Sequence, residues 1–364
     1  MRIREILQTL ETVAPIALQE DFDNSGVQVG DVSQEVKGIL LCIDVTENVI
    51  EEALSLDCNL IISHHPLAFR SFKSLTGRNY VERCMIKAIK NDICVYAMHT
   101  NLDNAAEGVN YKLAKMLGLC DVRILSPVST KLLKLVTFVP DSYAELLRNA
   151  LFNSGAGHIG NYDSCSYNIV GEGTFKAREG SSPFVGDIDE LHFEKEVRIE
   201  VILPDYKKED VLRALISVHP YEEPAFDFYR LENDWKQVGS GIVGVLPEPM
   251  SEYDFLYMLR DVFNLPYIQH TKLQNREIHD VAVCGGAGGF LLRQAVSYGA
   301  EAFVTGEAKY NDFHDVEGRL LMAVVGHYES EICTKDIFYD ILTKKYTTFA
   351  IHKSAFDSNP VKYL

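Results

Sequence analysis

Two adjacent histidines, His64 and His65, are the residues of this sequence whose type and position best suit chemistry. They follow the apolar segment 59–63, which predicts a buried strand, and Pro66 ends that strand directly after them. Proteins with α/β sheets usually bind ligands at the carboxyl ends of strands. Adjacent residues of an extended chain point in opposite directions, so the pair is better placed to serve two neighbouring ions than to grip one. Because unpaired imidazoles are costly to desolvate, metal ligation is favoured over core packing.

A second pair of metal-ligand type, His327 and Glu331, lies near the end of the sequence, after the apolar segment 322–325. Their spacing of four places both side chains on one face of a helix. The same spacing separates His99 from Asp103, which also follow an apolar strand. This repetition predicts that two distant parts of the chain contribute comparable ligands.

Together these segments offer three histidines and two carboxylates as metal ligands: His64, His65, Asp103, His327 and Glu331. This set of nitrogen and oxygen donors suits zinc, iron or manganese and is poor for calcium. We expect two divalent metal ions per subunit, with Glu331 bridging ions that lie roughly 3.5–4 Å apart. His99 is either a sixth ligand or a residue that holds Asp103 or a ligand imidazole in place.

The elements that must position these residues alternate between apolar strands and amphipathic helices, which predicts an α/β fold with a sheet flanked by helices. The predicted elements of this first part are the strand 38–44, the helix 47–56, the strand 59–63, the helix 83–90, the strand 93–98 and the helix 108–117.

The same alternation returns after Gly239, with Cys284 matching Cys42 and 301–305 matching 59–63. We therefore predict two pseudo-equivalent α/β halves, residues 1–127 and 240–364, that form one metal-binding lobe.

The segment 128–239 has a different pattern, and we predict that it is an inserted ferredoxin-like α+β domain. Two apolar strands in it each end at Pro-Asp and are followed by predicted helices, at 143–151 and 208–217. The segment 155–173 is rich in Gly, Asn and Ser, which predicts a mobile loop.

Two further motifs belong to the second half. Thr305-Gly-Glu307 aligns with Ser63-His64-His65, so Glu307 should face the same cavity and is a candidate general base. The glycine-rich run 284–289, before a predicted helix at 290–298, has two interpretations: an anion site on backbone N–H groups, or tight packing.

Composition narrows the class of protein. The chain has 364 residues, with 35 Lys and Arg against 52 Asp and Glu and a net charge of −17, which disfavours binding to nucleic acid. No apolar run is long enough for a membrane span. The eight cysteines are scattered without a Cys-x-x-Cys motif, so we expect reduced thiols and a cytoplasmic protein.

Five motifs together resemble the Nif-three-like family, whose bacterial members are often catalogued as GTP cyclohydrolase I type 2 homologues. They are the opening Asp21-Phe-Asp-Asn-Ser-Gly-Val-Gln-Val-Gly30, Ser63-His-His-Pro66, His99-Thr-Asn-Leu-Asp103, Thr305-Gly-Glu307 and Gly326-His-Tyr-x-x-Glu331.

The resemblance covers both outer parts of the chain and implies that the five ligands named above form a dinuclear divalent-metal centre. It also implies a PII/CutA-like insert and a toroidal homohexamer. The sequence departs from many relatives at Lys309-Tyr-Asn-Asp-Phe, where those relatives have a histidine.

Two functions are compatible with these features. The first is a metal-dependent hydrolase of a nucleotide-like small molecule, in which two ions lower the pKa of a bridging water and Glu307 and His99 take part in catalysis. For a cyclohydrolase, the target would be the imidazole carbon of the purine. The alternative is a non-catalytic metal-binding assembly with a regulatory or scaffold role. A phosphoesterase of the Asp-His-His type is disfavoured because Ser63 precedes the histidine pair.

Overall fold

The computed structural model describes residues 1–362 and divides into two compact units. Unit 1 contains the chain up to Pro127 and from Gln237 onward, and unit 2 is Val128–Lys236. Among the described residues, no helix is both long and apolar enough to cross a membrane. The eight cysteines are all free thiols.

The first sheet of unit 1 has the strand order β1-β4-β3-β2-β15. Its central strands are parallel, and β1 pairs antiparallel with β4. Every residue of β2, β3 and β4 is buried, as expected for parallel strands covered on both faces. The strands are β1 (Gly26–Val29), β2 (Ile39–Cys42), β3 (Leu60–Ser63), β4 (Cys94–Ala97) and β15 (Ile351–Lys353).

Helices cover both faces of this sheet. Successive side chains of each strand point to opposite faces, so they belong to two different cores. Leu40 and Ile61 pack in one core with α2 (Glu47–Ser55) and α3 (Tyr80–Lys90). The alternate strand residues pack in the other core, with α1 (Ile3–Val13) and α12 (Thr334–Lys345). The N-termini of α2 and α3 are capped by Thr46 and Asn79.

The second sheet of unit 1 has the order β11-β14-β13-β12-β10-β5 and also has three parallel strands at its centre, β12, β13 and β14. The outer strands β10 and β11 pair antiparallel with β12 and β14. The strands are β5 (Cys120–Val128), β10 (Trp235–Ser251), β11 (Gln269–His270), β12 (Glu277–Cys284), β13 (Ala302–Thr305) and β14 (Leu321–Val324).

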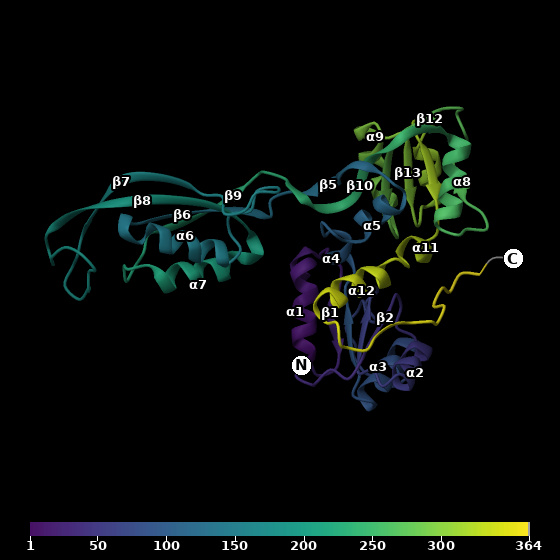
Figure 1. Ribbon diagram of the computed structural model, residues 1–364, viewed down its shortest axis with the longest axis horizontal. Helices are drawn as coiled ribbons and strands as arrows, with labels where there is room; N and C mark the ends of the chain where they lie inside the picture. Colours follow the sequence, from purple (N-terminus) through teal and green to yellow (C-terminus); the bar gives the residue numbers. More distant parts are fainter. Residues whose placement is uncertain (363–364) are drawn as a thin grey trace. The chain divides into compact units, whose positions relative to one another are not determined.

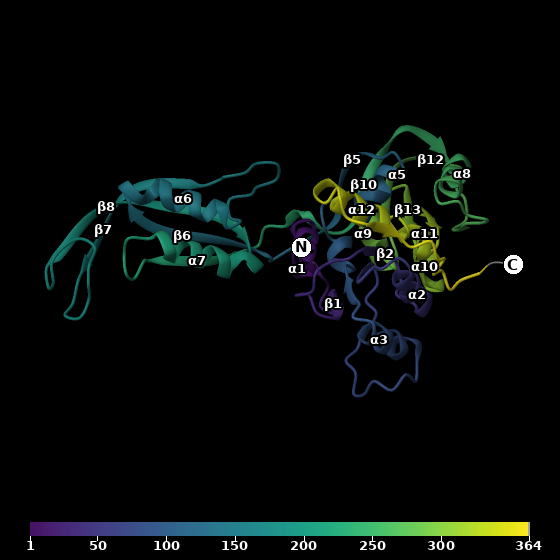
Figure 2. The same ribbon diagram turned by 60° about the horizontal axis from the view of Figure 1, so that its bottom comes forward.

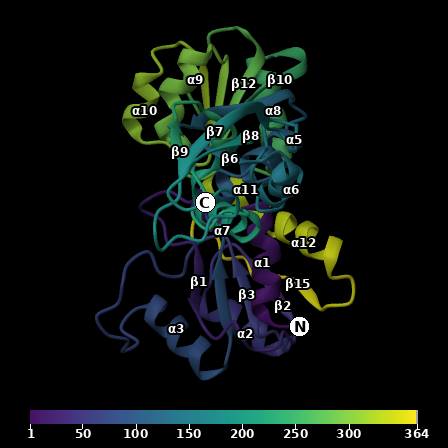
Figure 3. The ribbon, with the colours of Figure 1, turned by 90° about the vertical axis from the view of Figure 1, so that its left-hand side faces the viewer.

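Short helices follow the carboxyl ends of several central strands in unit 1. The important ones are α4 (Thr100–Asp103), which follows β4, and α11 (His327–Glu331), which follows β14. Figures 1 and 3 show α11 between the two sheets. The remaining helices of the unit are α5 (Val109–Met116), α8 (Glu252–Val262), α9 (Leu292–Tyr298) and α10 (Tyr310–Asp315).

Unit 2 is a four-stranded antiparallel sheet in the order β7-β8-β6-β9, with two helices on one face. Figure 2 shows α6 and α7 running side by side along the sheet. Leu135 and Ile199 from the strands and Leu147 and Leu215 from the helices form the core between them. The elements are β6 (Leu132–Pro140), α6 (Ala144–Asn153), β7 (Tyr167–Lys176), β8 (Leu191–Pro204), α7 (Lys208–Val218) and β9 (Phe226–Leu231).

The prediction of a loop throughout 155–173 was wrong, because β7 begins at Tyr167. β7 is the edge strand of its sheet and most of its side chains are exposed, so its sequence lacks the alternation of apolar and polar residues that marks a half-buried strand. Gly171 and Gly173 within it strengthened the resemblance to a loop.

Replacement of Leu40 by Ala tests the core of the first sheet. The side chain of Leu40 is fully buried, so we expect the free energy of unfolding of unit 1 to fall by about 2–5 kcal/mol. Leu54→Ala on α2 is the matched control, since Leu54 is 41% exposed and should lose much less. Urea denaturation followed by circular dichroism would measure both, and equal losses would contradict this description of the core.

Candidate metal centre

His64 and His65 extend beyond the carboxyl end of β3, where their backbone N–H groups bond to the carbonyls of Cys42 and Ile43. His64 is fully buried, and its Nδ1 lies 2.8 Å from the carbonyl oxygen of Met98. A proton on Nδ1 satisfies that carbonyl and leaves Nε2 as a lone-pair donor. The backbone therefore fixes the tautomer in which His64 can bind a metal.

The imidazole of His65 is oriented by a carboxylate. Its Nδ1 lies 2.7 Å from Oδ1 of Asp44, which follows β2, the strand next to β3. The second oxygen of Asp44 accepts a hydrogen bond from the hydroxyl of Ser358 at 2.9 Å. A carboxylate on the outer nitrogen of a metal-binding histidine fixes the ring and increases its basicity. Nε2 of His65 is thereby directed into the same space as that of His64.

His327 and Glu331 reach this space from α11, the short helix that follows β14 of the second sheet. Oε2 of Glu331 lies 3.1 Å from Nε2 of His327, as the spacing of four on a helix predicts, and 3.0 Å from Nε2 of His65. The Nε2 atoms of His65 and His327 are 3.2 Å apart. Residues that are far apart in the sequence therefore converge at one point.

Asp103 completes the predicted group from α4. Its Oδ1 lies 3.7 Å from Nε2 of His64, and Oε1 of Glu331 lies 3.6 Å from the same nitrogen. His64 thus faces one carboxylate from each of two short helices, and the structure brings all five predicted residues together.

His99 also faces the group, with its ring centroid 5.3 Å from that of His64 and 5.4 Å from that of His65. Its Nδ1 lies 2.8 Å from Oδ1 of Asp23, so Asp23 is the partner of the outer nitrogen of His99. Asp23 also accepts hydrogen bonds from the backbone N–H and the hydroxyl of Thr100. His99 is therefore held as firmly as His65, by the same kind of carboxylate.

The donor atoms of this cluster fit a metal ion. Two groups of three have their donor atoms within 4.8 Å of one another: His64 with His65 and His99, and His65 with His327 and Glu331. Among residues 1–362, Nε2 of His64 and Oε2 of Glu331 are buried without a hydrogen-bond partner. Buried polar atoms are normally satisfied, so two such atoms in a cluster of imidazoles and carboxylates fit a site that binds a cation.

The pKa values of the cluster reflect crowded charges. Burial alone would lower the pKa of His65, but the carboxylates of Asp44 and Glu331 raise it to about 10. Burial raises the pKa of Asp103 to about 7, although His64 opposes the shift. The pKa of Glu331 lies well below its usual range because the surrounding imidazoles outweigh its burial. The imidazoles and carboxylates of the cluster therefore determine one another's pKa values.

A cavity of about 770 Å³ adjoins the cluster and is lined by His65, His327, Glu307 and Lys309 among others. Glu307 faces this cavity, and its Oε1 lies 3.1 Å from Nδ1 of His327. Glu307 therefore pairs with the outer nitrogen of His327, at a longer distance than the 2.7 Å between Asp44 and His65.

The glycine-rich run between β12 and α9 serves packing. The N–H groups of Gly285, Gly286 and Gly288 donate to the side chains of Asn110, Ser330 and Thr305, so they are not available to an anion. Gly286 has φ +58°, and a Cβ there would lie 2.1 Å from Oε1 of Glu331. Its lack of a side chain makes room for the carboxylate.

The roles of Asp23 and Asp44 were not predicted from the sequence. Asp44 is the last residue of the predicted strand 38–44, at the end of the sheet where ligands bind, which was an available signal. Asp23 lies in a motif that was used only for the family resemblance. Its pairing with His99 spans 76 positions, and no local pattern indicates it.

Comparisons with known proteins identify the family of this chain. Residues 1–360 match the family described as Duf34/NIF3 (NGG1p interacting factor 3). A protein of Halalkalibacterium halodurans named "GTP cyclohydrolase 1 type 2 homolog" is 40% identical over 85% of this chain and 84% of its own. A Bacillus subtilis protein of the same name is 36% identical over 99% of this chain and 98% of its own.

Among solved structures, a Bacillus cereus protein related to NIF3 has a TM-score of 0.87 at 34% identity, and the match covers 100% of this chain and 99% of that one. The family predicted from five short motifs is therefore confirmed along nearly the whole chain. This chain is a member of the Duf34/NIF3 family.

Proposed function

We propose that this protein binds two divalent metal ions per subunit, zinc, iron or manganese, and hydrolyses a nucleotide-like small molecule. The ligands would be the five residues predicted from the sequence: His64, His65, Asp103, His327 and Glu331. The observation that carries the proposal is the buried, unpaired Nε2 of His64, which faces two carboxylates at 3.6 and 3.7 Å. Divalent ions bound there would supply Lewis acidity and lower the pKa of a coordinated water.

The residues around the ligands have separate tasks in this proposal. Asp44 and Glu307 hold the rings of His65 and His327 through their outer nitrogens, and Asp23 holds His99. Glu307 is 60% exposed at the cavity, so it can also move a proton to or from a bound molecule. His99 remains a candidate for catalysis or for a sixth ligand position.

The adjoining cavity supports a nucleotide-like substrate. Tyr267, Phe290 and Tyr328 line it and can stack on a flat ring, and Lys309 can pair with a phosphate. The relatives' name, GTP cyclohydrolase 1 type 2 homolog, agrees with a purine nucleotide as the substrate. The alternative is a metal-binding assembly without catalysis, which the firmly held and largely buried ligand cluster also suits.

Three features of the architecture belong to the same proposal. The two sheets of unit 1 would be pseudo-equivalent halves, which the similar orders β1-β4-β3-β2 and β11-β14-β13-β12 support. Unit 2 would be a ferredoxin-like, PII/CutA-like domain, which its order β7-β8-β6-β9 and two helices support. A cytoplasmic homohexamer without nucleic-acid partners is the assembly we propose, on the family resemblance and the net charge of −17.

Metal content tests the ligand assignment. We expect protein purified without chelators or affinity metals to contain two divalent ions per chain, and His64→Ala and Glu331→Gln to lose at least one of them. His279→Ala is the control, because His279 pairs with Asp280 outside the cluster. Elemental analysis by mass spectrometry gives the stoichiometry. Full metal content in both cluster variants would contradict the proposed site.

Asp44→Asn tests the positioning of His65. The amide oxygen of Asn can accept the Nδ1–H hydrogen bond, but without a negative charge it binds more weakly than a carboxylate, so we expect metal affinity to fall about 10–100-fold. Ser358→Ala removes only the hydrogen bond to the other oxygen of Asp44 and should have a smaller effect. Competition with a chromogenic chelator measures both affinities, and equal affinities for Asp44→Asn and the natural protein would exclude this role.

Nucleotide turnover distinguishes the hydrolase from the binding assembly. We expect the metal-loaded protein to convert GTP or another member of a nucleotide panel, and Glu307→Gln to lower kcat about 10²–10⁴-fold if Glu307 transfers a proton. Lys309→Ala should mainly raise KM for substrates that carry phosphate. Product analysis by liquid chromatography measures turnover, with elemental analysis as the control for metal content. An intact metal site with no turnover of any nucleotide would favour the binding assembly.

A further inference from the structure

A second hollow lies wholly within unit 2, on the face of its sheet that α6 and α7 do not cover. Its volume of about 540 Å³ is that of a small-molecule site. Alternation along β8 explains its lining, because Val197 and Ile199 pack in the core with the helices while Glu196 and Arg198 project from the opposite face. The sheet therefore forms the floor of the hollow.

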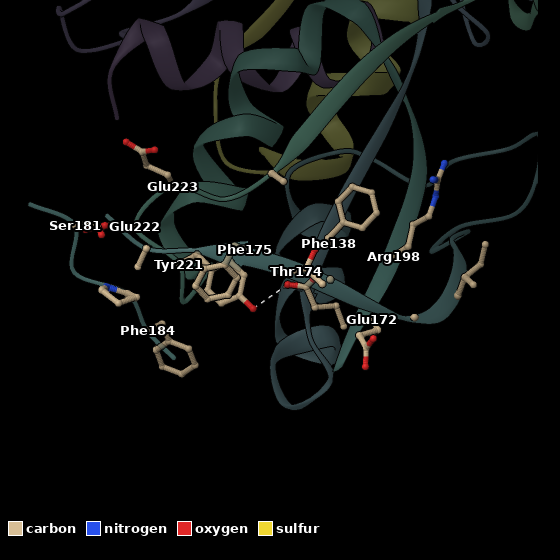
Figure 4. A pocket seen from close by; sticks show the side chains of 17 residues that line it. Phe138, Glu172, Thr174, Phe175, Ser181, Phe184, Arg198, Tyr221, Glu222 and Glu223 are labelled. Carbon is tan, nitrogen blue, oxygen red and sulfur yellow. Dashed lines mark hydrogen bonds between the residues drawn. The ribbon is translucent and has the colours of Figure 1, made fainter. Parts of the chain in front are cut away.

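Aromatic rings form one wall of this hollow. Figure 4 shows Phe175 of β7 close to Tyr221, with Phe184 beside them. The ring centroid of Tyr221 lies 6.1 Å from that of Phe175 and 6.3 Å from that of Phe184. Phe138 of β6 adds a fourth ring to the lining.

Hydrogen bonds hold this wall in place. The N–H of Tyr221 donates to Nδ1 of His219 at 3.1 Å, and Nε2 of His219 donates to the carbonyl of Phe138 at 2.9 Å. The hydroxyl of Tyr221 donates to Oε1 of Glu196 at 2.8 Å. A wall held in this way needs little reorganisation when it binds a ligand.

The charge of the lining is negative. Four carboxylates line the hollow, those of Glu172, Glu196, Glu222 and Glu223, against a single cationic side chain, Arg198. The guanidinium of Arg198 is already paired with Glu200, with Nε at 3.0 Å and Nη2 at 2.9 Å from the same oxygen. Arg198 is therefore poorly available to an anionic ligand, and the carboxylates remain uncompensated.

Glycines in β7 leave the space that the carboxylate of Glu196 occupies. A Cβ at Gly173 would lie 2.2 Å from Oε2 of Glu196, and a Cβ at Gly171, the register partner of Glu196, would meet no atom within 4 Å. The same glycines that made this segment resemble a loop thus open the hollow above the strand and allow Glu196 to lie along its floor.

We propose that this hollow binds a small organic cation, an amine or quaternary ammonium that carries an apolar group. Aromatic faces attract a cation through the negative charge of the ring face. Nearby carboxylates favour the cation further and repel phosphates and other anions. The site is independent of the proposed metal chemistry, since all of its residues belong to unit 2.

Calorimetric titration of the full chain at low salt tests this proposal, with benzyltrimethylammonium as the probe. Its neutral near-isostere 2-methyl-1-phenylpropan-2-ol and the anion p-toluenesulfonate are the comparison compounds. We expect saturable binding of one cation per chain, at least about tenfold weaker binding of the alcohol, and no binding of the sulfonate. Failure of the cation to saturate, equal affinity for the alcohol, or preference for the sulfonate would each overturn the proposal.

Variants locate the bound cation. Glu196→Gln and Tyr221→Leu should each weaken binding at least about tenfold, and Gly173→Ala should also weaken it by displacing the carboxylate of Glu196. Glu145→Gln, an exposed charge change on α6 outside the lining, should leave the affinity unchanged. Circular dichroism confirms that each variant is folded. Cation affinity that survives both Glu196→Gln and Gly173→Ala would place the cation elsewhere and overturn the proposal.

Discussion

The contact between the buried side chains of His64 and Glu331 is the constraint on which the rest of the candidate metal centre depends. An imidazole with no exposed surface and a nearly buried carboxylate face each other at 3.6 Å, and each has an atom without a hydrogen-bond partner among residues 1–362. Isolated polar groups of this kind are costly inside a protein. The surrounding chain can retain them because both belong to a group of donors that a cation would satisfy together.

Rigid strands, and carboxylates that contact the outer ring nitrogens of the histidines, fix the positions of these metal-ligand side chains. The histidines extend from β3 beside β2, and Asp44, at the end of β2, fixes the ring of His65 at 2.7 Å. The same arrangement recurs at His99 with Asp23 and at His327 with Glu307. Three of the four imidazoles are thus oriented by acids and one, that of His64, by a backbone carbonyl, which directs the opposite nitrogens inward.

Unit 2 uses its acidic residues in a different way. The carboxylates of the candidate metal centre lie beside imidazoles, whereas Glu196 lies beside aromatic rings and accepts a hydrogen bond from the hydroxyl of Tyr221. A strand with one face on the helices must project its alternate residues to the other side, and in β8 these include Glu196, Arg198 and Glu200. The open face of this sheet therefore combines carboxylates with aromatic rings around the hollow.

The sequence by itself determined the α/β alternation, the five clustered side chains and the family, because strand ends, a spacing of four on a helix and short motifs are local properties. Tertiary structure alone decided that Asp23 holds His99, that Gly286 makes room for Glu331 and that β7 is an edge strand. Each of these depends on contacts between residues distant in the chain. The local periodicity of apolar residues indicates which side chains are buried and which face of an element they point to. It does not indicate which distant segment of the chain contacts that face.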